Sequence, residues 1–109
     1  MAWLVRSDEV LATAEVVADR RGRARGLLGR RSVEGVLVLR PCRQVHTFGM
    51  RFPIDVAFCD GEGRVLRCAS LRPWRVSRPV ARAAFVIEAE AGAFARWRLA
   101  VGDRLELRG

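Results

Sequence analysis

The chain has no lysine, tyrosine or asparagine, and it has only one histidine among its 109 residues. All 20 basic residues are therefore arginines, which gives a formal net charge of +8 at pH 7. A genome rich in guanine and cytosine produces this composition in proteins of any function, so the charge alone does not identify a partner. No apolar run approaches the roughly 20 residues that cross a bilayer, so we expect no membrane-spanning helix.

Closely spaced cysteines are also missing, and residues 1–9 do not form a secretion signal. The three cysteines include no Cys-x-x-Cys pair, which is typical of a reducing compartment rather than of a disulfide framework. We therefore expect a cytoplasmic protein. Half of the residues are apolar, and residues 1–109 are predicted to form a single domain with its own core.

Short apolar segments alternate with turn residues along most of the chain, as they do in all-β folds. This pattern predicts a mainly β protein: a small antiparallel β-sandwich or partly open barrel of about seven short strands with one or two short helices. The predicted strands are 3–5, 10–17, 35–39, 54–59, 65–71, 83–89 and 104–107, with a weaker signal at 45–48; the predicted helices are 20–28 and 92–99.

Asp55 lies inside an apolar strand, between Ile54 and Val56. A buried carboxylate is costly unless it is paired, so the chain must supply a partner. That partner is either an arginine, for which Arg51 and Arg82 are the candidates, or a set of backbone amides. We favour this structural interpretation, with a structural ion pair as its main form. A general base or a ligand anchor is the functional alternative.

Cys42 and His46 are four residues apart in the segment before that strand. Residues at this spacing in a strand lie about 13 Å apart, which disfavours a catalytic Cys–His dyad. A zinc site would need Cys59 and Cys68 as further ligands, and the closely spaced ligand pairs of structural zinc sites are missing. We therefore expect no metal and no cofactor.

The expected register of the hairpin at residues 54–71 shows separately whether Cys59 and Cys68 can lie close together. With the turn at 60–63, Cys59 is expected opposite Arg64, and Cys68 opposite Asp55 or Val56. The two sulfur atoms would then lie roughly 13 Å out of step along the sheet, which disfavours both a shared metal and a disulfide.

Trp74 lies between Pro73 and Arg75 in an irregular connection after a strand. A tryptophan in such a place either covers the open end of the fold or lines a pocket, where a neighbouring arginine can meet an anion. The predicted polar pocket is lined by His46, Met50, Arg51, Asp55, Trp74 and Arg75.

Several short motifs, in this order, are similar to those of one family. The string RGLLGR at residues 25–30 resembles the arginine-glycine-leucine-x-x-arginine box of the domain of unknown function 192 family. The string PIDVAF at 53–58 looks like that family's proline-leucine-aspartate strand, and residues 83–92 and 101–104 are similar to its C-terminal signature. The resemblance covers about residues 10–107 and implies a compact, mainly β domain without an established reaction.

The sequence also departs from the pattern of that family. Many members of that family have a signal peptide, and many show a tryptophan-methionine-lysine-asparagine-threonine string before the proline. Here the corresponding residues 46–52 read HTFGMRF, so only Asp55 and the glycine turns carry over.

The favoured function is a non-catalytic binding or accessory module that holds a small anionic or polar ligand in the predicted pocket. The chain offers no set of nucleophile, base and oxyanion-stabilising groups, so binding is preferred to catalysis. One alternative is an enzyme that uses Asp55 or His46 as a general base on a small anionic substrate. Another is weak nucleic-acid binding through the arginine-rich surface, which charge without a motif disfavours. The sequence identifies no protein partner.

Overall fold

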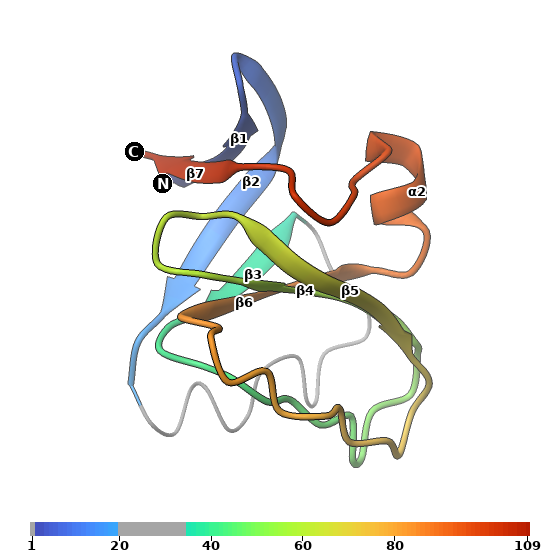
Figure 1. Ribbon diagram of the computed structural model, residues 1–109. Helices are drawn as coiled ribbons and strands as arrows, with labels where there is room; N and C mark the ends of the chain where they lie inside the picture. Colours follow the sequence, from blue (N-terminus) through green and yellow to red (C-terminus); the bar gives the residue numbers. More distant parts are fainter. Residues whose placement is uncertain (1, 20–34) are drawn as a thin grey trace.

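The computed structural model describes residues 2–19 and 35–109. Within these residues, seven strands form one sheet in the order β5-β4-β6-β3-β2-β1-β7. The sheet is strongly curled into a half-barrel, with the short helix α2 beside it (Figure 1). The elements are β1 (Ala2–Arg6), β2 (Glu9–Val17), β3 (Val36–Leu39), β4 (Ile54–Cys59), β5 (Val65–Leu71), β6 (Phe85–Glu90), α2 (Ala93–Trp97) and β7 (Leu105–Arg108).

The mainly β prediction is confirmed, and the observed form is the curled, partly open one. The sheet is mixed, because β2 and β3 run parallel from the pair Ala14–Val36 to the pair Val17–Leu39. Parallel neighbours need a long connection, and residues 18–35 separate these two strands in the sequence. The other strand pairs are antiparallel. The predicted helix at 20–28 lies outside the described residues.

The two edges of the curled sheet meet at one corner, where β5 and β7 begin. The Leu105 N–H donates to the Gly63 carbonyl, and the Val65 N–H donates to the Asp103 carbonyl, both at 2.8 Å. Gly63 has a φ of +87°, and a Cβ atom there would lie 2.0 Å from the Leu105 carbonyl oxygen. Only glycine fits this approach, so residue 63 joins the edges of the half-barrel.

Strand β4 is buried along its whole length and separates two apolar cores. Ile54, Val56 and Phe58 belong to one core, whereas Ala57 and Cys59 belong to the other. The side chains of β4 therefore alternate between the two cores, as the two-residue period of a strand requires. The consequence is that Asp55 faces the core on which α2 packs.

The predicted register of the β4–β5 hairpin is wrong. The structure pairs Cys59 with Val65 and Ala57 with Cys68, with a register shift between Phe58 and Cys59. Phe58 pairs with Arg67 and Cys59 with Val65, so the extra residue of the bulge is Leu66 on β5. Because Cys68 pairs with Ala57, and Ala57 lies in the same core as Cys59, the two cysteines share a face, about 7 Å out of step along the sheet. Neither is in a disulfide.

Helix α2 has five residues and packs beside β6. No helix in the described segments is long and apolar enough to cross a bilayer.

Candidate functional site

Two connections lie side by side at one end of the half-barrel, at the bottom of Figure 1. They are residues 40–53, between β3 and β4, and residues 72–84, between β5 and β6; we call them together the paired-loop platform. Backbone hydrogen bonds join them from Thr47 N–H to Arg75 O (2.8 Å), from Trp74 N–H to Thr47 O (2.9 Å), from Ser77 N–H to Val45 O (2.8 Å) and from Val80 N–H to Arg43 O (2.9 Å). The weak strand signal at 45–48 corresponds to an isolated bridge between His46 and Val76.

Two buried hydroxyl groups fix the platform from inside. Thr47 is fully buried, and its Oγ1 donates to the Arg72 carbonyl at 2.5 Å and accepts from the Arg75 N–H at 2.9 Å. Ser77 is also buried, and its Oγ accepts from the Val45 N–H at 3.0 Å. Sequence reasoning does not single out these residues, because a hydroxyl in a loop is ordinarily solvated.

Three rings follow one another across the outer surface of the platform. The His46 ring stacks on Phe48 with centroids 5.2 Å apart, and its Nδ1 accepts from the Phe48 N–H at 3.2 Å. The Phe48 and Trp74 rings are tilted at 37° with centroids 6.3 Å apart. Phe48 is 46% exposed and Trp74 is 64% exposed, so the row presents a large aromatic surface to solvent.

The backbone of Trp74 is left-handed, with a φ of +64°. A bulky side chain rarely adopts this conformation, and it costs about 1–3 kcal/mol. Here the loop hydrogen bonds hold Trp74 in it, and the indole still points outward rather than into a core. Strain of this kind is concentrated at binding sites.

The platform carries seven arginines and no acidic residue. All seven are exposed, and none forms an ion pair with an acid of the described residues. They are Arg40, Arg43, Arg51, Arg72, Arg75, Arg78 and Arg82. The positive charge at this end of the fold is therefore available to a ligand.

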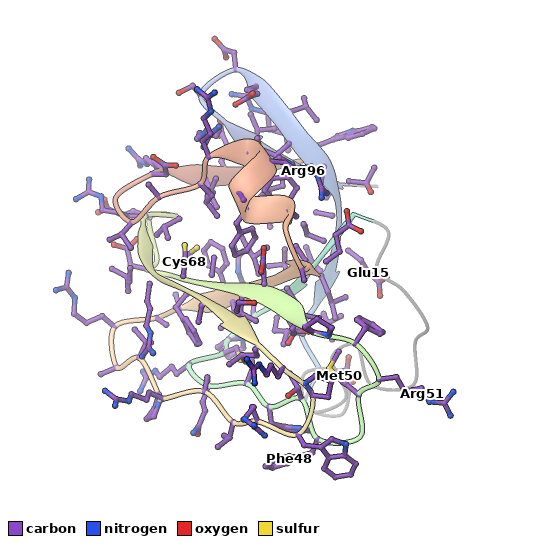
Figure 2. All side chains as sticks on the ribbon, turned by 90° about the vertical axis from the view of Figure 1, so that its right-hand side faces the viewer. Glu15, Phe48, Met50, Arg51, Cys68 and Arg96 are labelled. Carbon is purple, nitrogen blue, oxygen red and sulfur yellow. The ribbon has the colours of Figure 1, made fainter. Side chains whose placement is uncertain are left out.

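The structure brings together part of the predicted pocket. His46, Trp74 and Arg75 share the platform, and Arg51 projects from the same end (Figure 2). Met50 instead packs into a core at 5% exposure. Asp55 contacts a different part of the fold, and Phe48 takes a place in the row that sequence reasoning did not assign.

Asp55 binds the start of α2. Its Oδ2 accepts from the Gly92 N–H at 3.0 Å and from the Phe94 N–H at 3.2 Å. Among the predicted partners, the backbone amides are therefore the ones observed, and neither Arg51 nor Arg82 pairs with this carboxylate. The reason is that the first turn of a helix leaves its N–H groups without intrahelical partners, whereas the two arginines remain solvated.

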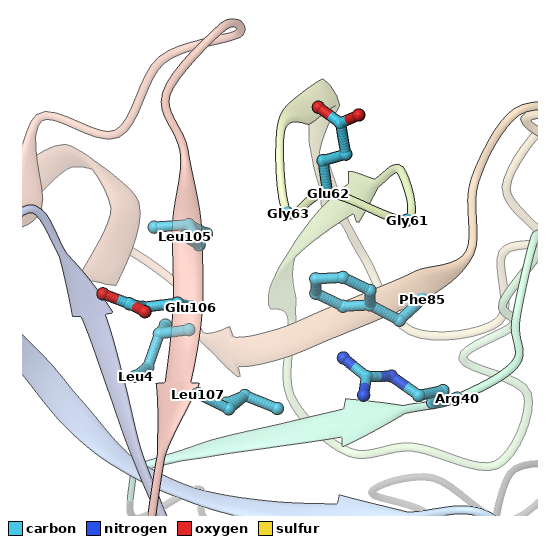
Figure 3. A pocket seen from close by; sticks show the side chains of 9 residues that line it. All are labelled: Leu4, Arg40, Gly61, Glu62, Gly63, Phe85, Leu105, Glu106 and Leu107. Atoms are coloured by element: carbon cyan, nitrogen blue, oxygen red, sulfur yellow. The ribbon is translucent and has the colours of Figure 1, made fainter.

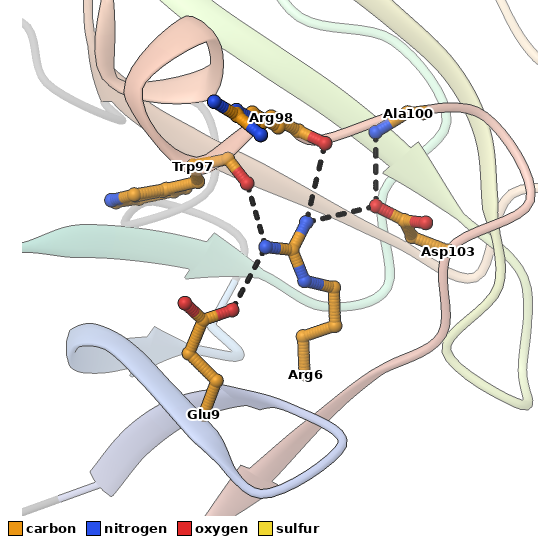
Figure 4. A network of polar contacts seen from close by, with 6 residues as sticks. All are labelled: Arg6, Glu9, Trp97, Arg98, Ala100 and Asp103. Atoms are coloured by element: carbon orange, nitrogen blue, oxygen red, sulfur yellow. Dashed lines mark hydrogen bonds and ion pairs between the residues drawn. The ribbon is translucent and has the colours of Figure 1, made fainter.

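Arg6 binds the other end of α2 (Figure 4). Its guanidinium donates to the Trp97 carbonyl at 2.6 Å and to the Arg98 carbonyl at 3.3 Å. It also pairs with Glu9 at 2.8 Å and with Asp103 at 3.0 Å. The hydrogen bond to Glu9, with that to Asp103, raises the pKa of Arg6. One side chain thus links β1, β2, α2 and the turn before β7.

The cysteines take separate positions. Burial raises the pKa of Cys59 to about 12, and it also raises the pKa of Cys68. Cys42 Sγ donates to the Gln44 carbonyl, whereas the His46 ring contacts Phe48, so the structure does not assemble a Cys42–His46 dyad. The described residues contain no group of three or more histidine, cysteine, aspartate or glutamate side chains that could hold a metal.

A cavity of about 210 Å³ opens at the mouth of the half-barrel (Figure 3). The Arg40 guanidinium lies over the Phe85 ring there, 4.8 Å from its centroid. None of the predicted pocket residues lines this cavity. Its lining residues are Leu4, Arg40, Gly61, Glu62, Gly63, Phe85, Leu105, Glu106 and Leu107.

Comparison with known proteins agrees with this architecture. The profile of a family described as DUF192, uncharacterized ACR, matches residues 3–107. The chain belongs to the DUF192 family. The resemblance seen in the sequence is thereby confirmed.

The names of three similar proteins state no function that could be compared with this site. A UPF0127 protein from Pyrococcus horikoshii is 32% identical over 89 residues, which cover 77% of each chain. A UPF0127 protein from Pyrococcus abyssi is 40% identical over 62 residues, which cover 57% of this chain and 53% of that one. A crystal structure of a protein of unknown function from Novosphingobium aromaticivorans superposes with a TM-score of 0.81 at 22% identity. That match covers 96% of this chain and 82% of the other, and it shows the fold alone.

Proposed function

We propose that this DUF192 protein is a non-catalytic binding module whose paired-loop platform recognises an anionic ligand with flat, unsaturated rings. The observation that carries the proposal is the exposure of Trp74, 64%, beside Phe48, 46%. Two adjacent large apolar side chains in water lose the stabilisation that burial would give them, and such patches mark interaction sites.

The rigidity of the platform supports this function. A loop that must be ordered during binding loses affinity, whereas a loop already held in place does not. Thr47 and Ser77 hold the two connections together through buried hydroxyl groups. The rings are thereby presented in a fixed arrangement before any ligand arrives.

The charge of the platform supports an anionic partner. The two connections that carry the ring row hold seven exposed arginines and no acidic residue, although one of them, Arg40, lies over Phe85 at the mouth of the half-barrel. A guanidinium group also stacks on flat rings and donates several hydrogen bonds to carboxylate or phosphate oxygens. Rings and arginines together therefore match a ligand that is both flat and negatively charged.

The acid–base alternative receives less support from the geometry. The Asp55 carboxylate accepts from two amides of α2, whereas the His46 ring contacts Phe48 and lies on the platform. The two groups share no hydrogen-bonding partner. General acid–base catalysis needs converging groups around one substrate atom, and this pair does not supply them.

A thermal-shift screen tests the proposal. Wild type, Trp74→Ala and Trp3→Ala are melted with aromatic anions, such as nucleoside monophosphates and aromatic carboxylates, and with inorganic phosphate and succinate. Trp3 is the matched control, because it is 41% exposed on β1, outside the platform. We expect aromatic anions to stabilise wild type and Trp3→Ala, but not Trp74→Ala. Equal stabilisation of Trp74→Ala, or none for any protein, contradicts the proposal.

A further inference from the structure

We infer that the ligand of the paired-loop platform is a single strand of nucleic acid, whose bases stack on Phe48 and Trp74 while its phosphates meet the arginines of the same platform. This inference rests on the proposed function, since it assigns a ligand class to the same surface. It differs in requiring a polymer, with more than one base and more than one phosphate bound together.

The ring row favours a ligand with more than one base. Phe48 and Trp74 are both exposed, with centroids 6.3 Å apart and planes inclined by 37°, so the two rings do not form one flat surface. His46 extends the row on the far side of Phe48. One small flat ligand covers one such ring. Successive bases of a flexible strand can cover consecutive rings, as they do on the stacking platforms of single-strand binding proteins.

The arginines favour a ligand with several phosphates. They are distributed along both connections of the platform rather than drawn from one short segment, so their charges are spread along this end of the fold. Elsewhere in the described chain, Arg6, Arg96 and Arg108 pair with acidic side chains. The platform arginines make no such pair, so a phosphate backbone can approach them without displacing an acid.

A double helix does not fit the same surface. Its bases are stacked on one another, so their faces are not available to Phe48 and Trp74. Proteins that recognise double-stranded DNA commonly place a helix in the major groove. The described helix, α2, has only five residues and lies away from the platform (Figure 1). A polyanion without rings is the remaining alternative, and it leaves the exposed aromatic side chains without a role.

The fold supplies the aromatic side chains that nucleic-acid binding requires beside the basic charge. In the sequence, charge occurs without a binding motif, which disfavours this ligand. In the structure, Phe48 and Trp74 come from connections that are far apart along the chain, yet their rings meet on the platform that carries the arginines. Basic charge interleaved with exposed rings is typical of single-strand binding surfaces.

Fluorescence anisotropy of a labelled oligothymidylate tests the inference. The strand has about 12 nucleotides, within the known range of single-strand site sizes. We expect Trp74→Ala to bind about tenfold more weakly than wild type, Trp74→Phe to keep most of the affinity, and Trp3→Ala to match wild type. The melting temperature of each variant shows that it is folded.

Salt and charge reversal test the phosphate contacts. If four arginines each neutralise one phosphate, raising the salt from about 50 to about 200 mM weakens binding about 50-fold. The double variant Arg72→Glu/Arg78→Glu should abolish measurable binding. Arg64→Glu is the matched control, because Arg64 is exposed in the β4–β5 turn, outside the platform, and should bind nearly as wild type does.

Four unlabelled ligands separate the outcomes. Displacement by unlabelled strand, but not by the corresponding duplex or by inorganic polyphosphate, supports the inference. If thymidine monophosphate binds as tightly as the strand and still requires Trp74, the inference fails and the proposed function stands. If polyphosphate competes equally and Trp74→Ala binds like wild type, charge alone explains binding and both fail. No binding of the strand at low salt overturns the inference and leaves the small-molecule screen as the test of the proposed function.

Discussion

Asp55 and Arg6 bind opposite ends of the same five-residue helix, α2. The carboxylate accepts from two backbone N–H groups at the first turn, and the guanidinium donates to two carbonyl groups at the last turn. Each charge has the sign that the helix dipole favours at that end. A helix of five residues does not form by itself in water, so α2 depends on these contacts and on its packing.

Removal of the Asp55 carboxylate should destabilise the fold without affecting the platform. Asp55→Ala leaves two N–H groups at the buried side of α2 without an acceptor, which costs about 1–3 kcal/mol in the free energy of unfolding. Asp55→Asn keeps an acceptor oxygen and should lose less. Urea denaturation measures both. Asp8→Ala is the control, because Asp8 is fully exposed and lies 3.8 Å from Arg108; it should change stability by less than about 0.5 kcal/mol.

Removal of Arg6 should have a similar effect through the other end of the helix. Arg6→Ala loses the donors to Trp97 and Arg98, and we expect a loss of about 2 kcal/mol in the free energy of unfolding. Because both side chains hold the same helix, the loss in Arg6→Ala/Asp55→Ala should be smaller than the sum of the single losses. Strict additivity in a urea-denaturation cycle would show that the two ends of α2 are independent.

Closure of the half-barrel should depend on Gly63. Gly63→Ala places a Cβ atom 2.0 Å from the Leu105 carbonyl oxygen at a φ of +87°. The strain and the clash together should cost at least about 2 kcal/mol in the free energy of unfolding. Gly61→Ala is a control from the same turn, because a Cβ atom there meets nothing within 4 Å. Equal melting temperatures for the two variants would contradict the close approach of β5 and β7.

The platform should require the Thr47 hydroxyl group. Thr47→Val keeps the shape of the side chain but removes the hydrogen bonds to Arg72 and Arg75, leaving a half-buried carbonyl and a half-buried amide to find other partners. We expect a loss of about 1–3 kcal/mol in the free energy of unfolding and weaker ligand binding, although every exposed ring and arginine is retained. Ser70→Ala on the exposed surface of β5 is the control. Unchanged binding by Thr47→Val would mean that the platform does not need this anchor.

Stability should fall at alkaline pH because of Cys59. Its pKa is raised to about 12 from 9.0 by burial, so the native state favours the neutral thiol. The unfolded chain ionises first, and stability present below about pH 9 is lost as the pH rises towards 12, by at most ~1.4 kcal/mol per pH unit for this one group. The chain has no lysine or tyrosine to titrate in the same window.

Cys59→Ala provides the control for this pH dependence. It should be less stable than wild type at neutral pH because it leaves a small cavity in the core. Its stability should nevertheless decline less steeply between pH 9 and 12, with the remaining slope due to Cys68, whose pKa is also raised. Parallel curves for the two proteins, measured by urea denaturation across this range, would exclude Cys59 as the cause.

Local patterns in the sequence predict much of the strand structure. The bounds of β4 and β5 match the predicted segments 54–59 and 65–71, because alternation and a glycine-containing turn are local signals. The register shift at Phe58 and Cys59 is not visible in that pattern, since it adds one residue to β5 and leaves the alternation of β4 unchanged. The predicted cysteine register fails for this reason.

The candidate site depends on contacts that local patterns do not contain. The partners of Asp55 lie in α2, and the partner of Phe48 lies in the connection after β5. Such pairs become visible only when the sheet is assembled. Met50 shows the same limit from the other side, because an apolar residue in a loop is equally compatible with a pocket and with a core, and here it joins the core.

The last strand of the chain, β7, lies against the first, β1, from the pair Trp3–Arg108 to the pair Arg6–Leu105, and the two termini are neighbours in Figure 1. During synthesis on the ribosome, β1 therefore lacks one of its neighbours until the C-terminal residues have left the exit tunnel. The contact between Gly63 and Leu105 cannot form before the same residues emerge. The half-barrel is consequently completed only after β7 has emerged, and a nascent chain stalled before Leu105 should remain sensitive to protease.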